Sequence, residues 1–558
     1  MSDKSSSSSI IFRPTRRQAL GMAIAGAAGL TMPNLTGAGR ALAATPPSEP
    51  KGQVIVGFSQ EPTVFNPHLP HIEVDEGIHF SVFDPLFGVD PKGNFFPALA
   101  KEVPTVENGG ISADGLEWHV KLRDDVKWHD GQPFTAEDVK FTLELLVDPK
   151  FRSWRRAGHE LVQDLTVVSP TEIKWKMKEP YAPYPSILAA TFIVPKHVLG
   201  AAEDKNTAPF NNAPIGTGPF KWVERMAGDH IELAANTDYF ADGPYLKSLI
   251  YKYIPDLTVL YTQFKTGDID VIGLQWITAD HYEEAKELGG TSVAVIPAAT
   301  VESLSFNMER PQFKELAVRQ ALYHALDKKT IIDALYYGLP APTETYMPQQ
   351  SFYYNPDLPK QEYDVDKAKK LLDDAGWVPG ADGIRVKDGV RLSFKNSTTA
   401  GNHIREQAQQ FIQQSYRDIG VEVMISNLPP AAMWGDYWMK SEFDSVVVGI
   451  NFLTGSDPDT SDYLSSKSIP AKGGAGQNTW QYASPEVDKL LGSGGVEFVP
   501  EKRKQAYLKI QETVRNDLPF LPMFQYATVR GHKSGVEGVE PNINVRIDSW
   551  DVATWHWA

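Results

Sequence analysis

Most residue patterns that mark catalytic or phosphate-binding sites are missing from this 558-residue sequence. It contains no HExxH zinc motif, no GxxxxGK[ST] phosphate loop and no GxSxG nucleophile turn. It also has no cysteine, which excludes a thiol nucleophile. The glycines at positions 473, 474 and 476 lack a preceding strand and a phosphate-binding spacing, so we interpret them as part of a loop. Because catalytic groups can converge from distant segments, these absences lower the expectation of an enzyme without removing it.

Two groups of side chains could in principle bind a metal ion. One consists of His68, His71 and His79, and the other of Asp457, Asp459 and Asp462. The histidines lie in a proline-containing segment, where unrelated surface positions are the simpler interpretation. The aspartates lack the spacing of a known calcium loop, and Asx turns and helix capping explain them more simply. We therefore predict no bound metal and no cofactor.

The first 43 residues have the order of an export signal. A serine-rich stretch precedes Arg16 and Arg17, and an uncharged run over residues 19–30 follows. The run is too short to span a bilayer, which needs roughly 20 apolar residues. The arginine pair resembles the twin-arginine export signal. Ala41 and Ala43 form an A-x-A site, so we predict cleavage after Ala43 and a periplasmic location.

The absence of cysteine also excludes disulfides and an N-terminal lipid anchor, so the core alone must stabilise the fold. The formal charge of the whole chain is −16, and the basic leader makes the remainder more acidic still. Such a surface repels nucleic acid and anionic lipid, so we predict neither as a partner. We expect a freely diffusing monomer.

The pattern along the chain alternates between strands and helices, which predicts α/β layers in more than one domain. Residues 54–58 and 445–450 have the composition of buried strands. Between about 85 and 210, period-2 alternation predicts an antiparallel sheet with a few helices. Thr135 and Asp138 have the spacing of a helix-capping pair.

The second half is more helical. Apolar residues fall on one helical face over residues 313–325 and again over 368–375, where Gly376 follows as a stop signal. A helix over residues 404–419 ends at Gly420 and leads into a strand over 421–425, which is an α/β unit.

Residues 116–141, LEWHVKLRDDVKWHDGQPFTAEDVKF, resemble the signature of the dipeptide- and oligopeptide-binding receptors of ABC importers, solute-binding protein family 5. Further similar motifs follow in the family's order, and they are IVPKH at 193–197, PIGTGPF at 214–220, FKTGDID at 264–270, FNM at 306–308, VRQAL at 318–322 with ALD at 325–327, and YASPEVD at 482–488. Together they cover nearly the whole chain after the leader.

The resemblance implies an α/β, two-lobed periplasmic binding protein of type II that closes about a hinge, with an extra α+β subdomain inserted in lobe one. Mapped onto this sequence, lobe one takes residues 44–84, 215–301 and 525–558. The inserted subdomain takes 85–214, and lobe two takes 302–524. In the family, residues 116–141 lie in the inserted subdomain, so this signature identifies the fold rather than the binding site.

The resemblance also implies a function. It predicts a non-catalytic receptor that encloses a small solute between its lobes and delivers it to the transmembrane subunits of an ABC permease. The default solute is a short peptide. Closure is expected to depend on the differential contacts of the solute with the closed state.

In peptide-binding relatives, the loop after the strand equivalent to residues 445–450 carries an aspartate that pairs with the α-ammonium of the peptide. When the Asp457-Pro-Asp459 motifs are matched, Thr454 takes its place. A buried ammonium without a carboxylate costs several kcal/mol, so an ordinary peptide N-terminus requires another acid. The acids that could compensate are Asp457 and Asp459, or Glu73, Asp75 and Glu76 at the expected rim of lobe one. The alternative is that all five are solvated.

The other candidate contacts are uncharged. Asn451, Phe452 and Thr454 supply an amide, a ring and a hydroxyl, and Thr398, Thr399 and Asn402 precede the helix at 404. Trp276, after the strand over 270–274, offers a flat face for stacking, whereas Trp434 and Trp438 fit a helix core better. Such a set also suits an oligosaccharide or an opine-type solute, which is our alternative cargo.

Two other classes of function stay open at this point. An exported hydrolase on the same fold requires a nucleophile paired with a base between the lobes. A metal or metallophore receptor requires His68, His71 or His403 to converge there.

Overall fold

A mixed eleven-stranded sheet organises the protein, and the computed structural model describes residues 46–453, 455–474, 476–545 and 547–558. Its strands in spatial order are β17 (Glu422–Ile425), β16 (Ser393–Ser397), β18 (Ser445–Asn451), β11 (Thr291–Phe306), β19 (Phe520–Lys533), β10 (Val271–Ile277), β1 (Gln53–Phe58), β9 (Ser248–Tyr253), β8 (His230–Ala235) and β7 (Phe220–Met226), and β12 (Ala341–Pro342) pairs with β19. The predicted strands at 54–58 and 445–450 are confirmed as β1 and β18.

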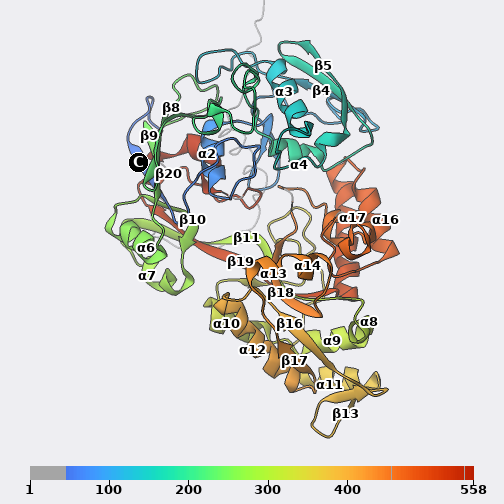
Figure 1. Cartoon of the computed structure of the whole chain (residues 1–558). Helices are drawn as coiled ribbons and strands as arrows, with labels where there is room; N and C mark the ends of the chain where they lie inside the picture. The colour runs from blue at the N-terminus through green and yellow to red at the C-terminus, as the bar shows by residue number, and fades with distance from the viewer. Residues whose placement is uncertain (1–45, 454, 475, 546) are drawn as a thin grey trace, which may run out of the picture. The chain divides into compact units, whose positions relative to one another are not determined.

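Two long antiparallel strands, β11 and β19, join the two halves of this sheet (Figure 1). On one side, β11 pairs with β18 and the parallel strands β16 and β17 follow. On the other side, β19 pairs with β10, and β1 lies parallel to both β10 and β9. The β11–β19 ladder shifts register between Pro297 and Val301, which locally interrupts its regular pairing.

A separate antiparallel sheet confirms the pattern predicted between residues 85 and 210. Its order is β4 (Glu117–Lys121), β6 (Glu172–Met177) and β5 (Val162–Ser169). The buried rings of Trp118 and Trp175 stack across β4 and β6 with centroids 5.6 Å apart. The remaining small strands are β2 (Phe87–Val89) with β3 (Phe95–Pro97), β13 (Val378–Pro379) with β14 (Arg385–Lys387) and β15 (Val390–Arg391), and β20 (Val536–Glu537) with β21 (His556–Trp557).

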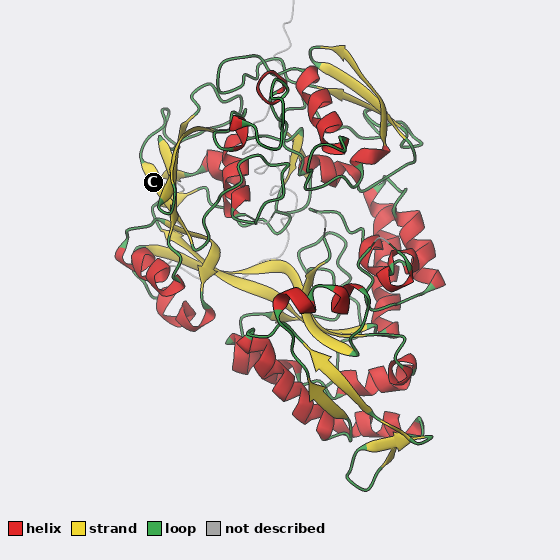
Figure 2. Ribbon diagram, viewed as in Figure 1, coloured by secondary structure: helices red, strands yellow, loops and turns green. Residues whose placement is uncertain are grey.

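The helices of the described residues flank these sheets (Figure 2). They are α2 (Asp75–Val82), α3 (Ala136–Val147), α4 (Tyr184–Ala189), α5 (Lys196–Leu199), α6 (Leu257–Thr266), α7 (Tyr282–Ala285), α8 (Pro311–Lys314), α9 (Leu316–His324), α10 (Lys328–Tyr336), α11 (Val365–Asp374), α12 (His403–Arg417), α13 (Pro430–Met433), α14 (Asp436–Met439), α15 (Ser461–Leu464), α16 (Pro485–Gly494) and α17 (Pro500–Asp517). None of those in the described part of the chain combines the length and apolar character needed to cross a bilayer.

Local sequence signals explain several helix ends. Thr135 and Asp138 form the predicted capping box at the start of α3. Gly376, with a φ of +85°, follows α11, and Gly420, with a φ of +82°, precedes β17. The single helix predicted over 313–325 is wrong, because Glu315 adopts an extended conformation and divides it into α8 and α9.

Separate hydrophobic cores lie along the chain. One combines Val54, Val56 and Phe58 of β1 with apolar residues of α2, β8 and β9 and with the C-terminal segment around Trp555. A second is confined to residues 86–193 and includes Trp118 and Trp175. Two others lie within residues 304–524. The residue boundaries that the family resemblance implies stay a prediction.

The two backbone segments that connect the first core to the second are bonded to each other. The chain enters residues 86–193 after Val82 and returns through residues 214–219, where the Gly218 N–H donates to the Val82 carbonyl at 2.8 Å. The Thr217 hydroxyl donates to Asp84 at 2.8 Å. Burial raises the pKa of Asp84 to about 6.

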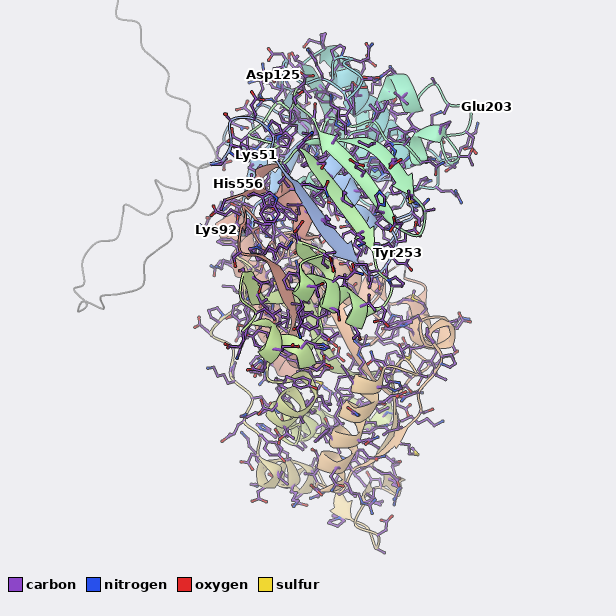
Figure 3. The ribbon with its side chains drawn as sticks, turned by 90° about the vertical axis from the view of Figure 1, so that its left-hand side faces the viewer. Lys51, Lys92, Asp125, Glu203, Tyr253 and His556 are labelled. Atoms are coloured by element: carbon purple, nitrogen blue, oxygen red, sulfur yellow. The ribbon has the colours of Figure 1, made fainter. Side chains whose placement is uncertain are left out.

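The two ends of the described chain also meet. The indole of Trp557 donates to the Gln53 carbonyl at 2.8 Å, and the Lys51 N–H donates to the Tyr245 carbonyl. The ring of Tyr245 packs against His556, and Figure 3 shows Lys51 and His556 close together. The last residues of the chain therefore add a hydrogen bond to the start of β1, which is paired with β9 and β10.

Candidate functional site

The carboxyl ends of two parallel strands, β16 and β18, lie side by side. Asn396 and Ser445 are register partners, so the loop at 398–402 lies beside the continuation of β18. The hydroxyl of Thr398 donates to the Val447 carbonyl at 3.0 Å, and Asn451 at the end of β18 is the register partner of Thr300 on β11. Ligands of α/β proteins bind outside the carboxyl ends of such strands. These loops and the adjoining parts of β11 and β19 form the candidate site.

The polar residues of the first loop mostly hold its own conformation. Thr398 is fully buried, and its N–H donates to the side chain of Asn427. Thr399 forms an isolated bridge with Leu428. Asn402 caps α12 by accepting a hydrogen bond from the Arg405 N–H at 3.2 Å. Of the three predicted contacts, Thr398 is buried, Thr399 is partly exposed and Asn402 is exposed.

The loop after β18 contains one predicted contact that packs inward. Phe452 is 2% exposed, and its ring packs against the rings of Tyr346, Tyr463, Trp480 and Phe520. Its neighbour Asn451 is partly exposed and accepts a hydrogen bond from the Leu453 N–H. Thr454 lies outside the described residues. The Phe452 ring thus anchors the loop that carries Asn451.

Asp457, a predicted partner for an ammonium group, is already paired within the protein. Arg503 of α17 donates to both of its carboxylate oxygens, at 2.5 and 2.9 Å. Both side chains are buried, with exposures of 3% and 6%. Burial alone would lower the pKa of Arg503, but the Asp457 carboxylate raises it above its ordinary value. The interpretation that Asp457 is solvated is wrong.

The turn that follows lies near Tyr181. Asp457 and Asp459 form the predicted Asx turns, with Asp459 accepting from the N–H and hydroxyl of Ser461. Burial, followed by the charge of Asp457, raises the pKa of Asp459. Burial together with the charges of Asp459 and Asp457 also raises the pKa of Tyr181. Close by, the Ala182 N–H donates to the Gly495 carbonyl at 2.8 Å, which joins two segments 313 residues apart.

The two predicted acids before and in α2, Glu73 and Asp75, also interact with other groups of the protein. Asp75 is fully buried and accepts hydrogen bonds from the N–H groups of Thr63, Val64 and Ile72. Burial raises the pKa of Asp75, although these bonds oppose the shift. Glu73 is exposed and acts electrostatically on Arg530 of β19. Asp75 therefore organises the loop before α2, and its solvated interpretation is wrong.

Trp276 lies within a strand rather than after one. The sequence pattern ended the strand at residue 274, but β10 continues to Ile277, which pairs with Val529 of β19. The extra length follows from pairing with β19, which local sequence does not reveal. The side chain of Trp276 lies outside what the structure describes. Of the other tryptophans, Trp438 is buried as predicted, whereas Trp434 is 43% exposed.

A buried ion pair at the centre of the site was not predicted. Glu302 of β11 is 1% exposed and accepts from Arg405 of α12 through both oxygens, at 2.6 and 2.8 Å. The hydroxyl of Tyr526 on β19 donates to the same carboxylate at 2.9 Å. Despite burial, the Glu302 charge raises the pKa of Arg405. The sequence offered one sign of this ion pair, namely a single acidic residue, Glu302, within the otherwise uncharged stretch 301–306.

The same pair lies directly against the end of β18. A Cβ placed on Gly449 would lie 2.7 Å from Glu302 and 2.9 Å from Arg405. A glycine at this position therefore lets the β18 backbone approach the ion pair closely. Glu302 links β11, α12 and β19, and it fixes the site where these elements meet.

The histidines that could have held a metal bond to the backbone instead. His68 and His79 are buried, and their Nε2 atoms bond to the carbonyls of Phe192 and Val64 at 2.7 and 2.8 Å. His71 contacts the ring of His79 and lies 3.6 Å from Glu76. His403 is 86% exposed at the start of α12, where it pairs with Glu406. Among the described residues, these histidines form no metal-ligating group.

The buried histidines predict a loss of stability in acid. Burial lowers the pKa of His68 to about 4 and that of His159 to about 3, and it lowers the pKa of His79 as well. Between pH 6.5 and 4 the unfolded chain binds protons at these positions that the folded chain excludes, so stability falls as pH falls. Burial also raises the pKa of Asp84, Asp75, Asp459 and Asp462, and these carboxyls act in the opposite direction. A fourth histidine, His129, whose pKa burial lowers to about 4, adds to the effect of the other three.

The expected result is a lower thermal midpoint at pH 5.0 than at pH 7.5. His68 alone should lower the free energy of unfolding by about 2 kcal/mol over this range. Calorimetry across this range measures it. The variant His68→Gln should have a shallower pH dependence, because it removes one titrating group. Equal midpoints at both pH values would contradict the burial of neutral imidazoles.

Comparison with known proteins places these features in context. The family model described as bacterial extracellular solute-binding proteins, family 5, middle region, matches residues 94–472. The oligopeptide-binding protein AppA of Bacillus subtilis (strain 168) is 29% identical over 514 residues, which cover 90% of this chain and 91% of AppA.

Solved structures agree with the sequence match. AppA from Bacillus subtilis in complex with a nonapeptide superposes with a TM-score of 0.71 at 29% identity, covering 92% of this chain and 100% of that one. NikZ from Campylobacter jejuni in complex with Ni(L-His) gives a TM-score of 0.73 at 28% identity, covering 91% and 99% of the two chains.

Proposed function

The chain belongs to family 5 of the bacterial extracellular solute-binding proteins, and from this premise we propose that it captures a peptide-like solute between two lobes and delivers it to the transmembrane subunits of an ABC permease. The family and the relatives are described as solute-binding or oligopeptide-binding proteins, which supports the role of a receptor. The fold is that of a two-lobed periplasmic binding protein.

The lobes are proposed to follow the division that the motifs implied. Lobe one takes residues 44–84, 215–301 and 525–558, the inserted subdomain 85–214, and lobe two 302–524. The cores within residues 304–524 support the bounds of lobe two, and the core within residues 86–193 supports an inserted subdomain. The core around β1 also takes in apolar residues between 145 and 210, so it joins this subdomain to lobe one. Strands β11 and β19 belong to both halves of the sheet, and their interrupted register near Pro297 supports a hinge there.

Closure about this hinge needs contacts that only the closed state makes, because a solute shifts the equilibrium by its differential affinity for the two states. The loop after β18 is suited to supply them. Its residue Gly455 lies next to Ser186 of the inserted subdomain, since a Cβ on Gly455 would be 3.8 Å from that side chain. Asn451, Thr454 and Thr399 remain the proposed polar contacts, together with Asn402, Glu73 and Trp276.

One observation carries the choice of solute, namely that Arg503 neutralises Asp457. The other acids considered for an ammonium group also have partners. Asp75 accepts three backbone hydrogen bonds, Asp459 holds Ser461, Glu76 lies near His71, and Glu73 interacts with Arg530. A buried ammonium needs an opposing charge. We therefore propose that the solute is bound without a carboxylate that recognises a peptide α-ammonium.

Matched peptide pairs test this proposal. Di- to pentapeptides with a free N-terminus and the same peptides with an acetylated N-terminus would be titrated calorimetrically into protein lacking residues 1–43. Acetylation is expected to change Kd by less than about threefold, because no ion pair is lost. Where a buried carboxylate pairs with the ammonium, loss of the ammonium charge costs about 2–5 kcal/mol of binding free energy, which raises Kd 30-fold or more.

A large loss on acetylation would contradict the proposed mode of binding. Oligosaccharides and opines in the same assay distinguish the alternative cargo, because their binding in the absence of peptide binding would overturn the peptide class. Native mass spectrometry of protein purified from its own host provides an independent check by identifying a co-purified solute.

Export is proposed to follow the twin-arginine route, with cleavage after Ala43 and release into the periplasm. The support is the order of Arg16 and Arg17, the apolar run and the A-x-A site in the sequence. This segment lies outside the described residues. The relatives are extracellular or periplasmic binding proteins, which agrees with export.

A further inference from the structure

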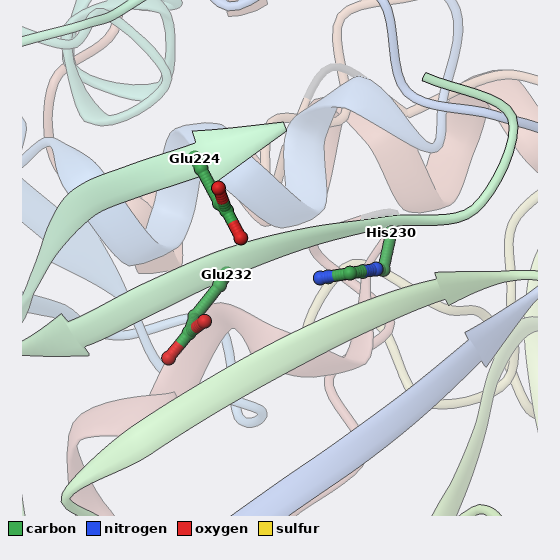
Figure 4. Close-up of side chains that lie close together, drawn as sticks. All are labelled: Glu224, His230 and Glu232. Carbon is green, nitrogen blue, oxygen red and sulfur yellow. The ribbon is translucent and has the colours of Figure 1, made fainter. Parts of the chain in front are cut away.

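A histidine and two glutamates gather on one hairpin at the end of the large sheet opposite β17 (Figure 4). Glu224 lies on β7, and His230 and Glu232 lie on β8. One ligand atom from each, a carboxylate oxygen or an imidazole nitrogen, lies within 4.8 Å of the others. Such a separation allows all three to approach one ion after small side-chain rotations.

A bulge in β7 brings Glu224 to this face. Trp222 pairs with Leu233 and Glu224 with Glu232, so Val223 is an extra residue in β7. In a regular strand, residues 222 and 224 would point to the same face, and there the ring of Trp222 packs against the buried ring of Phe65. The bulge turns Glu224 to the opposite face. Because of it, Glu224 and Glu232 are direct cross-strand neighbours.

The two glutamates form a like-charge pair, and neither takes part in an ion pair with a lysine or arginine of the described residues. Like charges directly opposite each other destabilise a sheet. Arg225 pairs with Glu61, and Lys252, the cross-strand neighbour of His230 on β9, donates to the side chain of Gln263 rather than to either glutamate. The arrangement therefore leaves negative charge on this face that a bound cation would neutralise.

The imidazole of His230 is oriented for a metal. Its Nδ1 lies 2.9 Å from the Asp229 carboxylate, which leaves Nε2 available. The ring is largely shielded, with a side-chain exposure of 20%. A carboxylate on the second ring nitrogen is the usual support of a metal-binding histidine, because it fixes the tautomer and raises the basicity of the ligand nitrogen.

From these contacts we propose that Glu224, His230 and Glu232 form a binding site for a divalent transition metal of the zinc type. One imidazole and two carboxylates match the ligands that Zn²⁺ accepts, and three protein ligands leave the fourth tetrahedral position for water. The site lies on the β7–β8 hairpin, at the other end of the sheet from the loops after β16 and β18. It is thus independent of the proposed solute site.

The ion would strengthen an exposed edge of the protein. Strand β7 is the last strand of the large sheet, so β8 is the one strand that it pairs with in the described part of the chain. An ion bound to Glu224 on β7 and to His230 and Glu232 on β8 cross-links the two strands. Binding to the folded state alone raises the thermal midpoint with increasing metal concentration.

Calorimetric titration of Zn²⁺ into chelator-treated protein lacking residues 1–43 and any histidine tag tests the proposal. We expect one Zn²⁺ per chain at micromolar Kd. The variants His230→Asn and Glu224→Gln should each weaken this binding at least tenfold, and Zn²⁺ should raise the thermal midpoint of the unmodified protein only.

His119→Asn is the matched control. His119 also bonds a glutamate, Glu172, across neighbouring strands, but that pair lacks a second carboxylate in reach. The control should keep full affinity. The proposal is overturned if the unmodified protein binds Zn²⁺ only at millimolar concentration, or if His230→Asn and His119→Asn bind it equally well. A circular dichroism spectrum of each variant verifies that it is folded.

Discussion

Replacement of Asp457 by asparagine is expected to lower the free energy of unfolding by about 3–5 kcal/mol. The substitution removes the charge that compensates the buried guanidinium of Arg503 and keeps the size of the side chain. Arg503 also donates to the Gly494 carbonyl, so it cannot swing into solvent without breaking the end of α16. The loss is therefore dominated by an unpaired buried cation.

Denaturant titration of the unmodified and substituted proteins measures this effect. The double variant Asp457→Asn with Arg503→Met should regain part of the lost stability, because the cation is then gone as well. Asp374→Asn is the control, since Asp374 forms an exposed ion pair with Lys370 and its loss should cost no more than about 1 kcal/mol.

The same variant tests the role of Asp457 at the site. If its carboxylate is structural, folded Asp457→Asn protein should bind solute with an affinity close to the original. The opposite pattern, unchanged stability and lost binding, would mean that the solute rather than Arg503 is the functional partner. In that case the proposed recognition without an ammonium-binding acid would be wrong.

The variant Gly216→Ala is expected to prevent stable folding or to cost more than about 3 kcal/mol. A Cβ at this position would lie 1.7 Å from the carbonyl oxygen of Val82, far inside van der Waals contact. The obstacle is backbone that cannot rotate away. Any movement would also break the bond from the Gly218 N–H to the Val82 carbonyl.

Soluble yield and the thermal midpoint report the outcome. The control is Gly492→Ala in α16, where an added Cβ meets nothing within 4 Å. Alanine is a better helix former than glycine, so this change should raise stability by up to about 1 kcal/mol. Equal midpoints for the two alanine variants would contradict the close approach at Val82.

Patterns that are local in sequence predicted their elements well. The alternation of Val54, Val56 and Phe58 is the signature of β1, and the spacing of Thr135 and Asp138 produced the capping box. Each depends on residues within a few positions of one another. The motifs from 116 to 488 likewise identified the family, because a family signature is also a local pattern.

The site could be predicted only in part, because its charges are paired over long distances. Glu302 and Arg405 are 103 residues apart, and Asp457 and Arg503 are 46 apart. Nothing near Asp457 in the sequence shows that its charge is already neutralised. The extension of β10 to Trp276 likewise depends on pairing with β19, which follows more than 240 residues later.

The contact between Gln53 and Trp557 allows the order of the elements to be rearranged. Because the two ends of the folded chain touch, a short linker could join them and new termini could be opened in an exposed turn. A circular permutant opened near Gly289, where an added Cβ meets nothing within 4 Å, would place its new ends just before β11. A fluorophore attached there and a second one on lobe two would report solute-driven closure as a change in the distance between them.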